Sequence, residues 1–386
     1  MDGELAGLTA RLTALAAEAG LDRVGVCAAD PFAATRLTIR SRKATGMSAR
    51  LGFTFTDPDV STDILRSFPW ARRLVVGIRS YLPDAGDPGP TRPGRGKVAR
   101  FAVSDAYQPL RSGLERLAVA LGEAGYRSQV LIDDSRLVDR AAAVRAGVGW
   151  WGKSAMVLSP GVGPWFLIGS VVTDARLSVS GPMERNCGSC EACLPACPTG
   201  ALVAPGVLDA RLCLAALAQS PGVIPRDLRP FLEDRLYGCD ECLTACPPGF
   251  RLLDRSASPR GSVDLVELLR TPDRELIGRF EHFYLPSRRP RVLRRNALVA
   301  LGNTGTADHL DLVAGYLGSP DWMLRLHAAW AVHRMGTRLS VRRAEMFLRH
   351  AASREGSPEV REELALAGVD TWAAAVPERS PGFESR

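Results

Sequence analysis

The sequence predicts an α+β protein in three parts, and three observations support this division. The first part alternates short apolar runs with helical patterns, eight of the nine cysteines lie between Cys187 and Cys246, and the last part repeats a helical pattern. A chain of 386 residues is long enough for two to three domains. The expected ranges are 1–178 for an α/β domain, 179–255 for a cysteine-rich module, 256–375 for an all-α repeat domain and 376–386 for a disordered tail.

In the first part, short apolar segments are predicted to form strands and amphipathic segments to form helices. The strands are expected at 23–27, 74–78, 128–132 and 165–173. Helices are expected at the leucine-lined N-terminal segment, at 110–123 and at 141–146. The segment 83–96 is rich in proline and glycine and is interpreted as a loop. Because Arg11 and Glu18 interrupt the N-terminal apolar stretch, it is expected to be neither a signal peptide nor a membrane span.

The cysteine spacing is typical of proteins that bind two iron–sulfur clusters. The first run has the pattern C-x₂-C-x₂-C-x₃-C-P of bacterial ferredoxins. It consists of Cys187, Cys190, Cys193 and Cys197 with Pro198. Cys239, Cys242 and Cys246, followed by Pro247, repeat the last three positions, and Cys213 is the other nearby thiol. Eight thiolates supply two sets of four, which two [4Fe–4S] clusters require. The sequence therefore predicts a ferredoxin-like module that transfers single electrons.

The spacing also predicts which cysteines share a cluster, because the fourth cysteine of such a run ligates the other cluster. One set is expected to be Cys187, Cys190, Cys193 and Cys246, and the other Cys197, Cys213, Cys239 and Cys242. Structural zinc is a less favoured alternative, since C-x₂-C pairs bind zinc without needing this run twice. A disulfide framework is less favoured still. Cys27, the ninth thiol, is interpreted as a small buried hydrophobe.

Positive charge in this chain is carried almost entirely by arginine. The formal net charge is +7, the isoelectric point is near 9.1, and Lys43, Lys97 and Lys153 are the only lysines. The guanidinium group binds phosphate through two parallel hydrogen bonds, so this composition suits a phosphate-bearing partner. Nucleotide bias in the genome is an equally good explanation of the total. We expect a cytoplasmic, oxygen-sensitive protein with no membrane contact, and a monomer.

The part after the cysteines repeats itself. Residues 293–302 align on 324–333 at an offset of 31 residues, with a leucine, an arginine and two alanines in common. Small residues at fixed positions allow paired helices to stack closely, as in a short HEAT-like solenoid. The starts of these helices are basic, with Arg288, Arg291 and Arg294 before the first. A solvated face and a nucleic-acid contact are both open interpretations of this charge.

The order of these three parts, together with several motifs, resembles the epoxyqueuosine reductases. Residues 137–153 are similar to the family's stretch that ends in R-A-G-x-G-W-x-G-K, and 236–240 and 294–303 match two further blocks. The resemblance implies a cobalamin-dependent enzyme with two [4Fe–4S] clusters. Such an enzyme removes the epoxide oxygen of epoxyqueuosine in a tRNA anticodon loop to give queuosine. It would receive electrons from an external low-potential donor such as ferredoxin or flavodoxin.

The resemblance also implies roles for individual residues. Asp133 matches the family's proton donor, although Asp134 follows it and the next residues depart from the family pattern. The expected cobalamin contacts are Arg100, Lys153, Val157, Ile168, Gly238, Cys239 and Asp240. Core packing alone could explain Val157 and Ile168. The five histidines all lie after residue 281 and the motif D-x-H-x-x-G is absent, so we expect no histidine below cobalt.

Recognition of an unstacked RNA base uses aromatic side chains, arginines and phosphate contacts. The expected tRNA contacts are Arg288, Arg291, Arg294, Arg295 and Asn296, with Phe283 or Tyr284 stacking on a base. Three segments depart from the family pattern, at Asp57, at Gln108 and at 134–136. Two alternatives therefore stay open. One is a corrinoid iron–sulfur reductase for another substrate, similar to the reductive dehalogenases, and the other is an electron-transfer module without its own catalysis.

Overall fold

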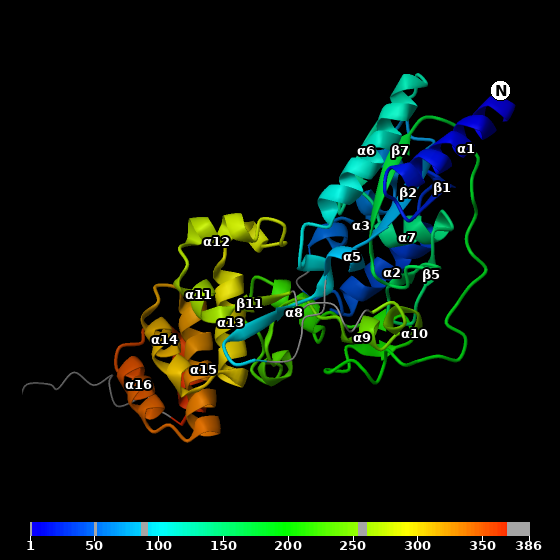
Figure 1. The fold of residues 1–386 in the computed structure, drawn as a ribbon. Helices are drawn as coiled ribbons and strands as arrows, with labels where there is room; N and C mark the ends of the chain where they lie inside the picture. Colours follow the sequence, from blue (N-terminus) through cyan, green and yellow to red (C-terminus); the bar gives the residue numbers. More distant parts are fainter. Residues whose placement is uncertain (1, 50–51, 86–91, 254–260, 369–386) are drawn as a thin grey trace, which may run out of the picture.

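The computed structural model describes residues 2–49, 52–85, 92–253 and 261–368 of the 386. Two lobes make up the molecule, an N-terminal lobe built around a sheet and a helical lobe that ends the described chain (Figure 1). The short helices α9 and α10 lie below the N-terminal lobe, and α8 lies between the lobes. The predicted tail at 376–386 falls outside the described residues.

A four-stranded sheet forms the centre of the N-terminal lobe, in the order β1-β2-β7-β4. Its strands are β1 (Arg23–Ala28), β2 (Arg73–Ser80), β7 (Phe166–Thr173) and β4 (Ser128–Ile132). All four predicted strands are thus confirmed. Every pairing in this sheet is antiparallel. The first domain is therefore a layered α+β structure rather than a parallel α/β sheet.

Helices cover both faces of this sheet, which explains why β2 is apolar without alternation. The helices α1 (Asp2–Glu18) and α6 (Tyr107–Glu123) pack on the face that carries Val75. The helices α2 (Ala33–Ala44) and α7 (Asp139–Arg145) pack on the face that carries Leu74 and Val76. Consecutive residues thus serve two separate cores, because neighbouring side chains of a strand point to opposite faces.

The remaining elements are short in the first two thirds of the chain and longer in the helical lobe. In the N-terminal lobe they are α3 (Pro58–Ser61), α4 (Ile64–Ser67), α5 (Leu82–Ala85), β3 (Arg95–Val98), β5 (Trp150–Trp151) and β6 (Val157–Leu158). The cysteine-rich part has β8 (Leu202–Ala204), β9 (Val207–Leu208), α8 (Leu214–Gln219), β10 (Arg235–Tyr237), α9 (Glu241–Thr244) and α10 (Pro247–Phe250). The helical lobe has β11 (Ser262–Asp264), α11 (Leu265–Arg270), α12 (Asp273–Arg279), α13 (Arg291–Thr304), α14 (Leu310–Gly315), α15 (Trp322–Leu339), α16 (Arg343–Ala352) and α17 (Pro358–Leu366).

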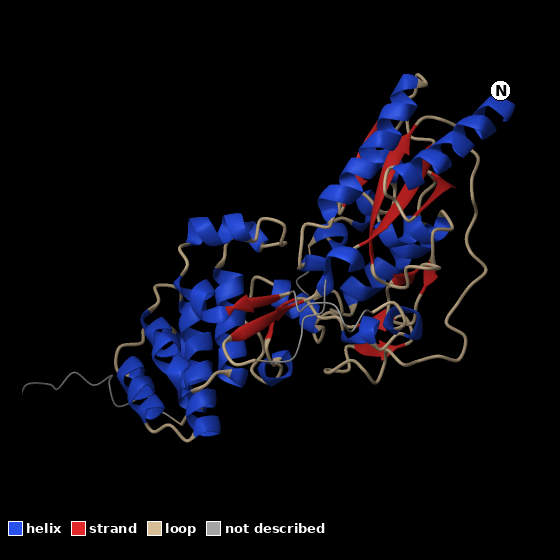
Figure 2. Ribbon diagram, viewed as in Figure 1, coloured by secondary structure: helices blue, strands red, loops and turns tan. Residues whose placement is uncertain are grey.

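The segment predicted as a loop at 83–96 is not a loop throughout. Its first residues belong to α5, and its last two begin β3, while 86–91 lie outside the described residues. The strand β3 extends from the N-terminal lobe towards the helical lobe (Figure 2). There it pairs in parallel with β10 and antiparallel with β11. The prediction was wrong at both ends because these pairings join segments that are distant in sequence.

The repeat predicted after the cysteines is confirmed as paired helices. The helix α13 packs along α15, and Gly302 lies so close to Trp330 and Ala331 that an added Cβ would come within 2.8 and 3.0 Å of them. Leu214, Leu236 and Leu298 share this core, so its packing joins the cysteine-rich part to the helical lobe. The domain boundaries at 178 and 255 stay predictions.

Candidate functional site

The eight clustered cysteines gather into two groups. Cys187–Cys197 lie in consecutive turns, Cys213 and Cys246 precede α8 and α10, and the remaining two flank the start of α9. Burial raises the pKa of Cys193, and the nearby thiols Cys246, Cys187 and Cys190 raise it further. Around the second group, burial raises the pKa of Cys242, and the thiols that add to this effect are Cys239, Cys213 and Cys197. These neighbours agree with the two sets of four that the spacing predicts, and the ligand sets stay a prediction.

The two groups differ in their surroundings. All nine cysteines are free thiols, Cys190 is exposed and Cys27 is buried. In the ranges that the structure describes, no three His, Cys, Asp or Glu side chains converge on a single metal ion. Cys213 of the second group lies near Arg140, whose charge lowers the pKa of this thiol against the larger effect of burial. One group therefore faces solvent at Cys190, while the other faces Arg140.

Asp133 lies near Tyr107 and Arg140, and Arg140 in turn lies near Cys213 of the second cysteine group. The Asp133 side chain is exposed, yet burial raises its pKa, against a hydrogen bond from Tyr107 and the charge of Arg140. The Tyr107 hydroxyl donates this hydrogen bond to Oδ2 at 3.5 Å. Arg140 is likewise exposed while burial lowers its pKa, and Cys213 is among its electrostatic neighbours. Burial raises the pKa of Tyr237, and the negative charge of Asp133 raises it further, so Tyr237 is another neighbour of Asp133.

Asp133 has a strained backbone, with φ at +49°. Aspartate is among the few non-glycine residues that tolerate this left-handed conformation, which costs free energy and is enriched at functional sites. Asp133 is the first residue after β4, where the chain turns towards α7.

Asp134 forms a hydrogen-bonded ion pair with a neighbouring arginine and is therefore a poor proton donor. Arg136 donates from Nε to Oδ1 at 2.9 Å and from Nη2 to Oδ2 at 2.6 Å. This hydrogen-bonded pair lowers the pKa of Asp134, so the carboxyl group stays ionised. Arg136 also lies over the ring of Phe68, 4.9 Å from its centroid. The two adjacent aspartates thus have opposite environments, and only Asp133 is suited to hold a proton.

The structure brings four of the expected cobalamin contacts together at the start of α9. The backbone N–H of Arg100 donates to Asp240 Oδ2 at 2.7 Å, and its guanidinium lies 3.5 Å from the same oxygen and over the ring of Trp165. Gly238 has φ at +74°, and a Cβ there would come within 2.4 Å of Ala99. Glycine is thus required at this approach. Cys239 follows directly.

The other three expected cobalamin contacts are more dispersed. Lys153 Nζ lies 3.1 Å from Glu191 Oε1, on the loop of the first cysteine group. Val157 is buried and Ile168 is partly buried in the core between the sheet and α7. Core packing accounts for both, so a contact with a bound group stays a prediction for them.

Two of the expected tRNA contacts are wrong. Arg295 and Asn296 are fully buried. The Arg295 guanidinium donates to the carbonyl oxygens of Leu217 and Ser220 at 2.8 and 2.7 Å, and Asn296 donates to Leu236. Both side chains satisfy backbone carbonyls between α8 and β10, so neither is free for RNA. The sequence could have indicated this burial, because Arg295 and Asn296 lie three or four residues from the buried Val292 and Val299 and so share their face of the helix.

The remaining residues expected to contact RNA differ in how exposed their side chains are. Arg294 pairs with Asp273 and Arg291 with Asp321, and both side chains are largely covered. Phe283 is buried and stacks on Tyr237 with ring centroids 4.1 Å apart, so its prediction as a base-stacking residue is wrong. Tyr284 is 54% exposed, and Arg288 is exposed. The Tyr284 backbone N–H donates to the Tyr237 hydroxyl at 2.9 Å, and Tyr237 is in turn an electrostatic neighbour of Asp133.

Replacing Arg295 with alanine is expected to lower the free energy of unfolding by about 3 kcal/mol or more, since several buried carbonyls would lose their donor. Arg349 on α16 is a matched control, because its pair with Glu345 is exposed. Arg349→Ala should cost about 0.5 kcal/mol or less. Urea unfolding followed by circular dichroism measures both, and equal effects would contradict the buried role of Arg295.

Three further residues near Asp133 were given no role from the sequence, namely Tyr107, Asp139 and Arg140. Asp139 and Arg140 begin α7, and Tyr107 begins α6. No spacing in the sequence relates Tyr107 to Asp133, because β4 and α6 bring them together only in the folded chain.

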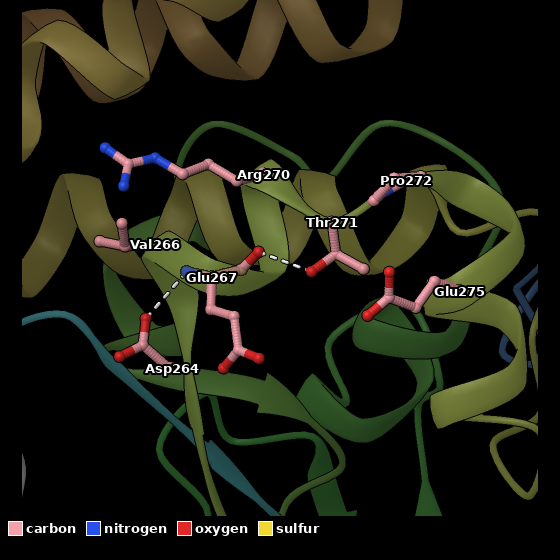
Figure 3. Close-up of a pocket in the computed structure, with 7 residues that line it drawn as sticks. All are labelled: Asp264, Val266, Glu267, Arg270, Thr271, Pro272 and Glu275. Carbon is pink, nitrogen blue, oxygen red and sulfur yellow. Dashed lines mark hydrogen bonds between the residues drawn. The ribbon is translucent and has the colours of Figure 1, made fainter.

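A surface depression on the helical lobe lies apart from these residues (Figure 3). It is lined by Asp264, Val266, Glu267, Arg270, Thr271, Pro272 and Glu275. Three carboxylates against one guanidinium make this depression unsuited to a phosphate. In the described part of the chain, no helix is long and apolar enough to cross a membrane.

Comparison with known proteins agrees with this geometry. Residues 186–249 match a family model described as a 4Fe-4S double cluster binding domain, and 285–367 match one described as HEAT repeats. Epoxyqueuosine reductase of Bacillus cereus is 31% identical over 82% of this chain and 86% of its own length. That of Pseudomonas aeruginosa is 35% identical over 69% and 78%. A crystal structure of epoxyqueuosine reductase with an epoxyqueuosine-modified tRNA-Tyr stem loop is 28% identical, with a TM-score of 0.86 over 94% of this chain and 98% of that one. The chain therefore belongs to the epoxyqueuosine reductase family.

Proposed function

We propose that this protein removes the epoxide oxygen of epoxyqueuosine in tRNA to give queuosine. The observation that carries the proposal is Asp133, an exposed carboxyl group whose pKa is raised by burial and whose neighbour Arg140 lies near Cys213. We propose that the reaction takes place in a cavity between Asp133 and the second cysteine group. Such a carboxyl group can donate a proton to a departing oxygen. The relatives from Bacillus cereus and Pseudomonas aeruginosa are both named epoxyqueuosine reductase, which supports the same reaction.

In this proposal the two cysteine groups hold the two [4Fe–4S] clusters and carry electrons inwards. An external low-potential donor such as ferredoxin or flavodoxin would reduce the cluster at the exposed Cys190. The cluster at Cys213 would pass electrons to the cavity, because this thiol lies near Arg140. The order follows from exposure, since Cys190 is exposed while the four cysteines of the second group are only partly exposed.

Cobalamin is proposed as a third cofactor in this cavity. Asp133 and Arg140 are exposed, and Arg140 lies near Cys213 of the cluster group that would supply electrons. Arg100, Gly238 and Asp240, with Cys239 and Lys153, would hold the cofactor. When bound, cobalamin would supply a strongly reducing nucleophile towards an epoxide carbon.

The exposed Tyr284 and Arg288 are proposed to bind the tRNA beside this cavity. Replacing Arg288 and the neighbouring exposed Arg289 with glutamate is expected to weaken tRNA binding uniformly across sequences. The slope of log affinity against log salt should become shallower by about 1 for each lost phosphate contact. Arg349→Glu on α16 is the matched control. An unchanged affinity and slope in the double variant would remove this surface from the proposal.

Mass spectrometry of nucleosides tests the reaction directly. Protein with both clusters reconstituted is reduced anaerobically and incubated with epoxyqueuosine-containing tRNA, with and without cobalamin. We expect queuosine, one oxygen lighter, only when cobalamin is present. No conversion by protein with intact clusters would contradict the proposed substrate and favour another one. Arg136, which pairs with Asp134 beside the proton donor, would then be the first residue to examine.

A further inference from the structure

The proposed reaction consumes more protons than Asp133 can supply in one transfer. Removing an epoxide oxygen breaks two C–O bonds, forms a C=C bond and releases the oxygen as water. The balance requires two electrons, which the external donor provides through the clusters, and two protons. Asp133 holds one proton at a time. A second group must therefore restore it, and this inference rests on the proposed function.

Asp139 is a carboxyl group near Asp133, and one of its oxygens accepts no hydrogen bond. It is the first residue of α7, six residues after Asp133. Its Oδ1 atom is buried, and no hydrogen-bond partner is found for it. Asp134, the third carboxyl group nearby, is held by Arg136 and stays ionised. Asp139 alone among the three is buried without a donor on this oxygen.

A buried carboxylate without compensating hydrogen bonds is costly, and such a group usually keeps its proton instead. Burial raises the pKa of Asp139 well above its ordinary value, and the negative charges of Asp133 and Asp134 raise it further. The charge of Arg140 opposes this effect. Tyr107, the other titratable neighbour, donates to Asp133 and is also influenced by the charge of Asp139.

We propose that Asp139 holds the second proton and returns it to Asp133 after the first transfer. Asp133 gives its proton to the epoxide oxygen and becomes a carboxylate. The Asp139 carboxyl group then loses its proton, the Asp133 carboxylate gains it, and Asp133 delivers it to form water. Asp139 regains a proton from solvent between turnovers. Asp139 acts only through Asp133, to which it supplies a proton, and is not itself a catalytic residue.

The order of the two ionisations predicts a pH effect. Asp133 ionises first, and its negative charge keeps Asp139 protonated to higher pH. Between its two apparent pKa values the pair therefore still holds one proton, which Asp139 passes to Asp133 for the first transfer while solvent supplies the second. In Asp139→Asn, only Asp133 remains. The proton supply would be lost as the pH rises through the lower pKa, so the alkaline fall in rate should move to lower pH.

The test compares Asp139→Asn with Asp139→Glu and with Asp63→Asn. Asp63 is a matched control, since its Oδ1 is also buried without a hydrogen-bond partner, but it lies at the start of α4. We expect Asp139→Asn to lower the rate of queuosine formation by roughly 10²-fold and to shift the alkaline fall to lower pH. Asp139→Glu should restore the wild-type profile, and Asp63→Asn should keep it. A structural role for Asp139 would lower the rate equally at every pH.

Infrared spectroscopy provides a readout that does not depend on turnover. The C=O band of neutral carboxyl groups at neutral pH should be weaker in Asp139→Asn than in the wild type and unchanged in Asp63→Asn. An unchanged band, or a wild-type rate and pH profile in Asp139→Asn, would overturn the inference. If the wild-type protein forms no queuosine, the proposed function fails instead, while the infrared band still shows whether Asp139 carries a proton.

Discussion

Replacing Asp133 with asparagine is expected to lower the rate of queuosine formation by about 10²- to 10⁴-fold, the usual contribution of a general acid. Asparagine has nearly the same shape and tolerates the left-handed backbone of this position, where φ is +49°. The substitution therefore removes the transferable proton while it preserves the turn after β4. Single-turnover mass spectrometry with reduced protein measures the effect.

Asp134→Asn is the matched control for this prediction. Asp134 is ionised in its pair with Arg136, so it has no proton to give, and its loss should affect the rate far less. Iron content and tRNA affinity should be unchanged in both variants. Full turnover by Asp133→Asn, or an equal loss in Asp134→Asn, would contradict the assignment of Asp133 as the acid.

Replacing Cys213 with alanine is expected to abolish turnover and to remove about half of the bound iron. Cys213 is expected to be the fourth ligand of the cluster that faces the cavity, and a [4Fe–4S] cluster requires four ligands. This cysteine lies next to α8 and outside both repeated runs, so the spacing says least about it. The variant therefore tests the least certain of the eight predicted cluster ligands. Iron analysis and electron paramagnetic resonance of the reduced protein measure the loss.

Cys27→Ala is the control for this variant. Cys27 is buried in the core between the sheet and α7, and burial raises its pKa to about 12, so it remains a thiol and a poor ligand. The control should retain all of the iron and the full rate. A Cys213→Ala protein with both clusters intact would show that another side chain completes the second set.

Much of the architecture could be predicted from the sequence because its signals are local. The four strands of the sheet and the helices α6 and α7 follow from apolar runs and periodicity, and the repeat of α13 in α15 follows from small residues at fixed positions. The spacing of the two runs assigns seven of the eight cysteines, because tight loops constrain which thiols can meet, while Cys213 was assigned as the other nearby thiol.

Positive charge in the sequence predicted RNA contacts less reliably than local spacing predicted strands and helices. Arg295 and Asn296 lie in a basic run and were predicted to bind RNA, but both are buried. Their donors satisfy carbonyl oxygens of distant segments, at Leu217 and Leu236. A polar side chain can be buried wherever the fold supplies partners, and the sequence does not show which carbonyls a fold leaves open.

By itself, the sequence determined the cysteine sets, the main strands and the helical repeat, because short-range spacing controls each of them. Only the tertiary structure decided the antiparallel order of the sheet, the pairing of β3 with β10 and β11, and the surroundings of each acid. Asp133 and Asp134 are chemically identical neighbours in the chain. Burial raises the pKa of Asp133 despite the hydrogen bond from Tyr107, while the hydrogen bonds from Arg136 in the following turn lower that of Asp134. Proton affinity depends on burial and on nearby charge, and both arise only when distant segments pack together.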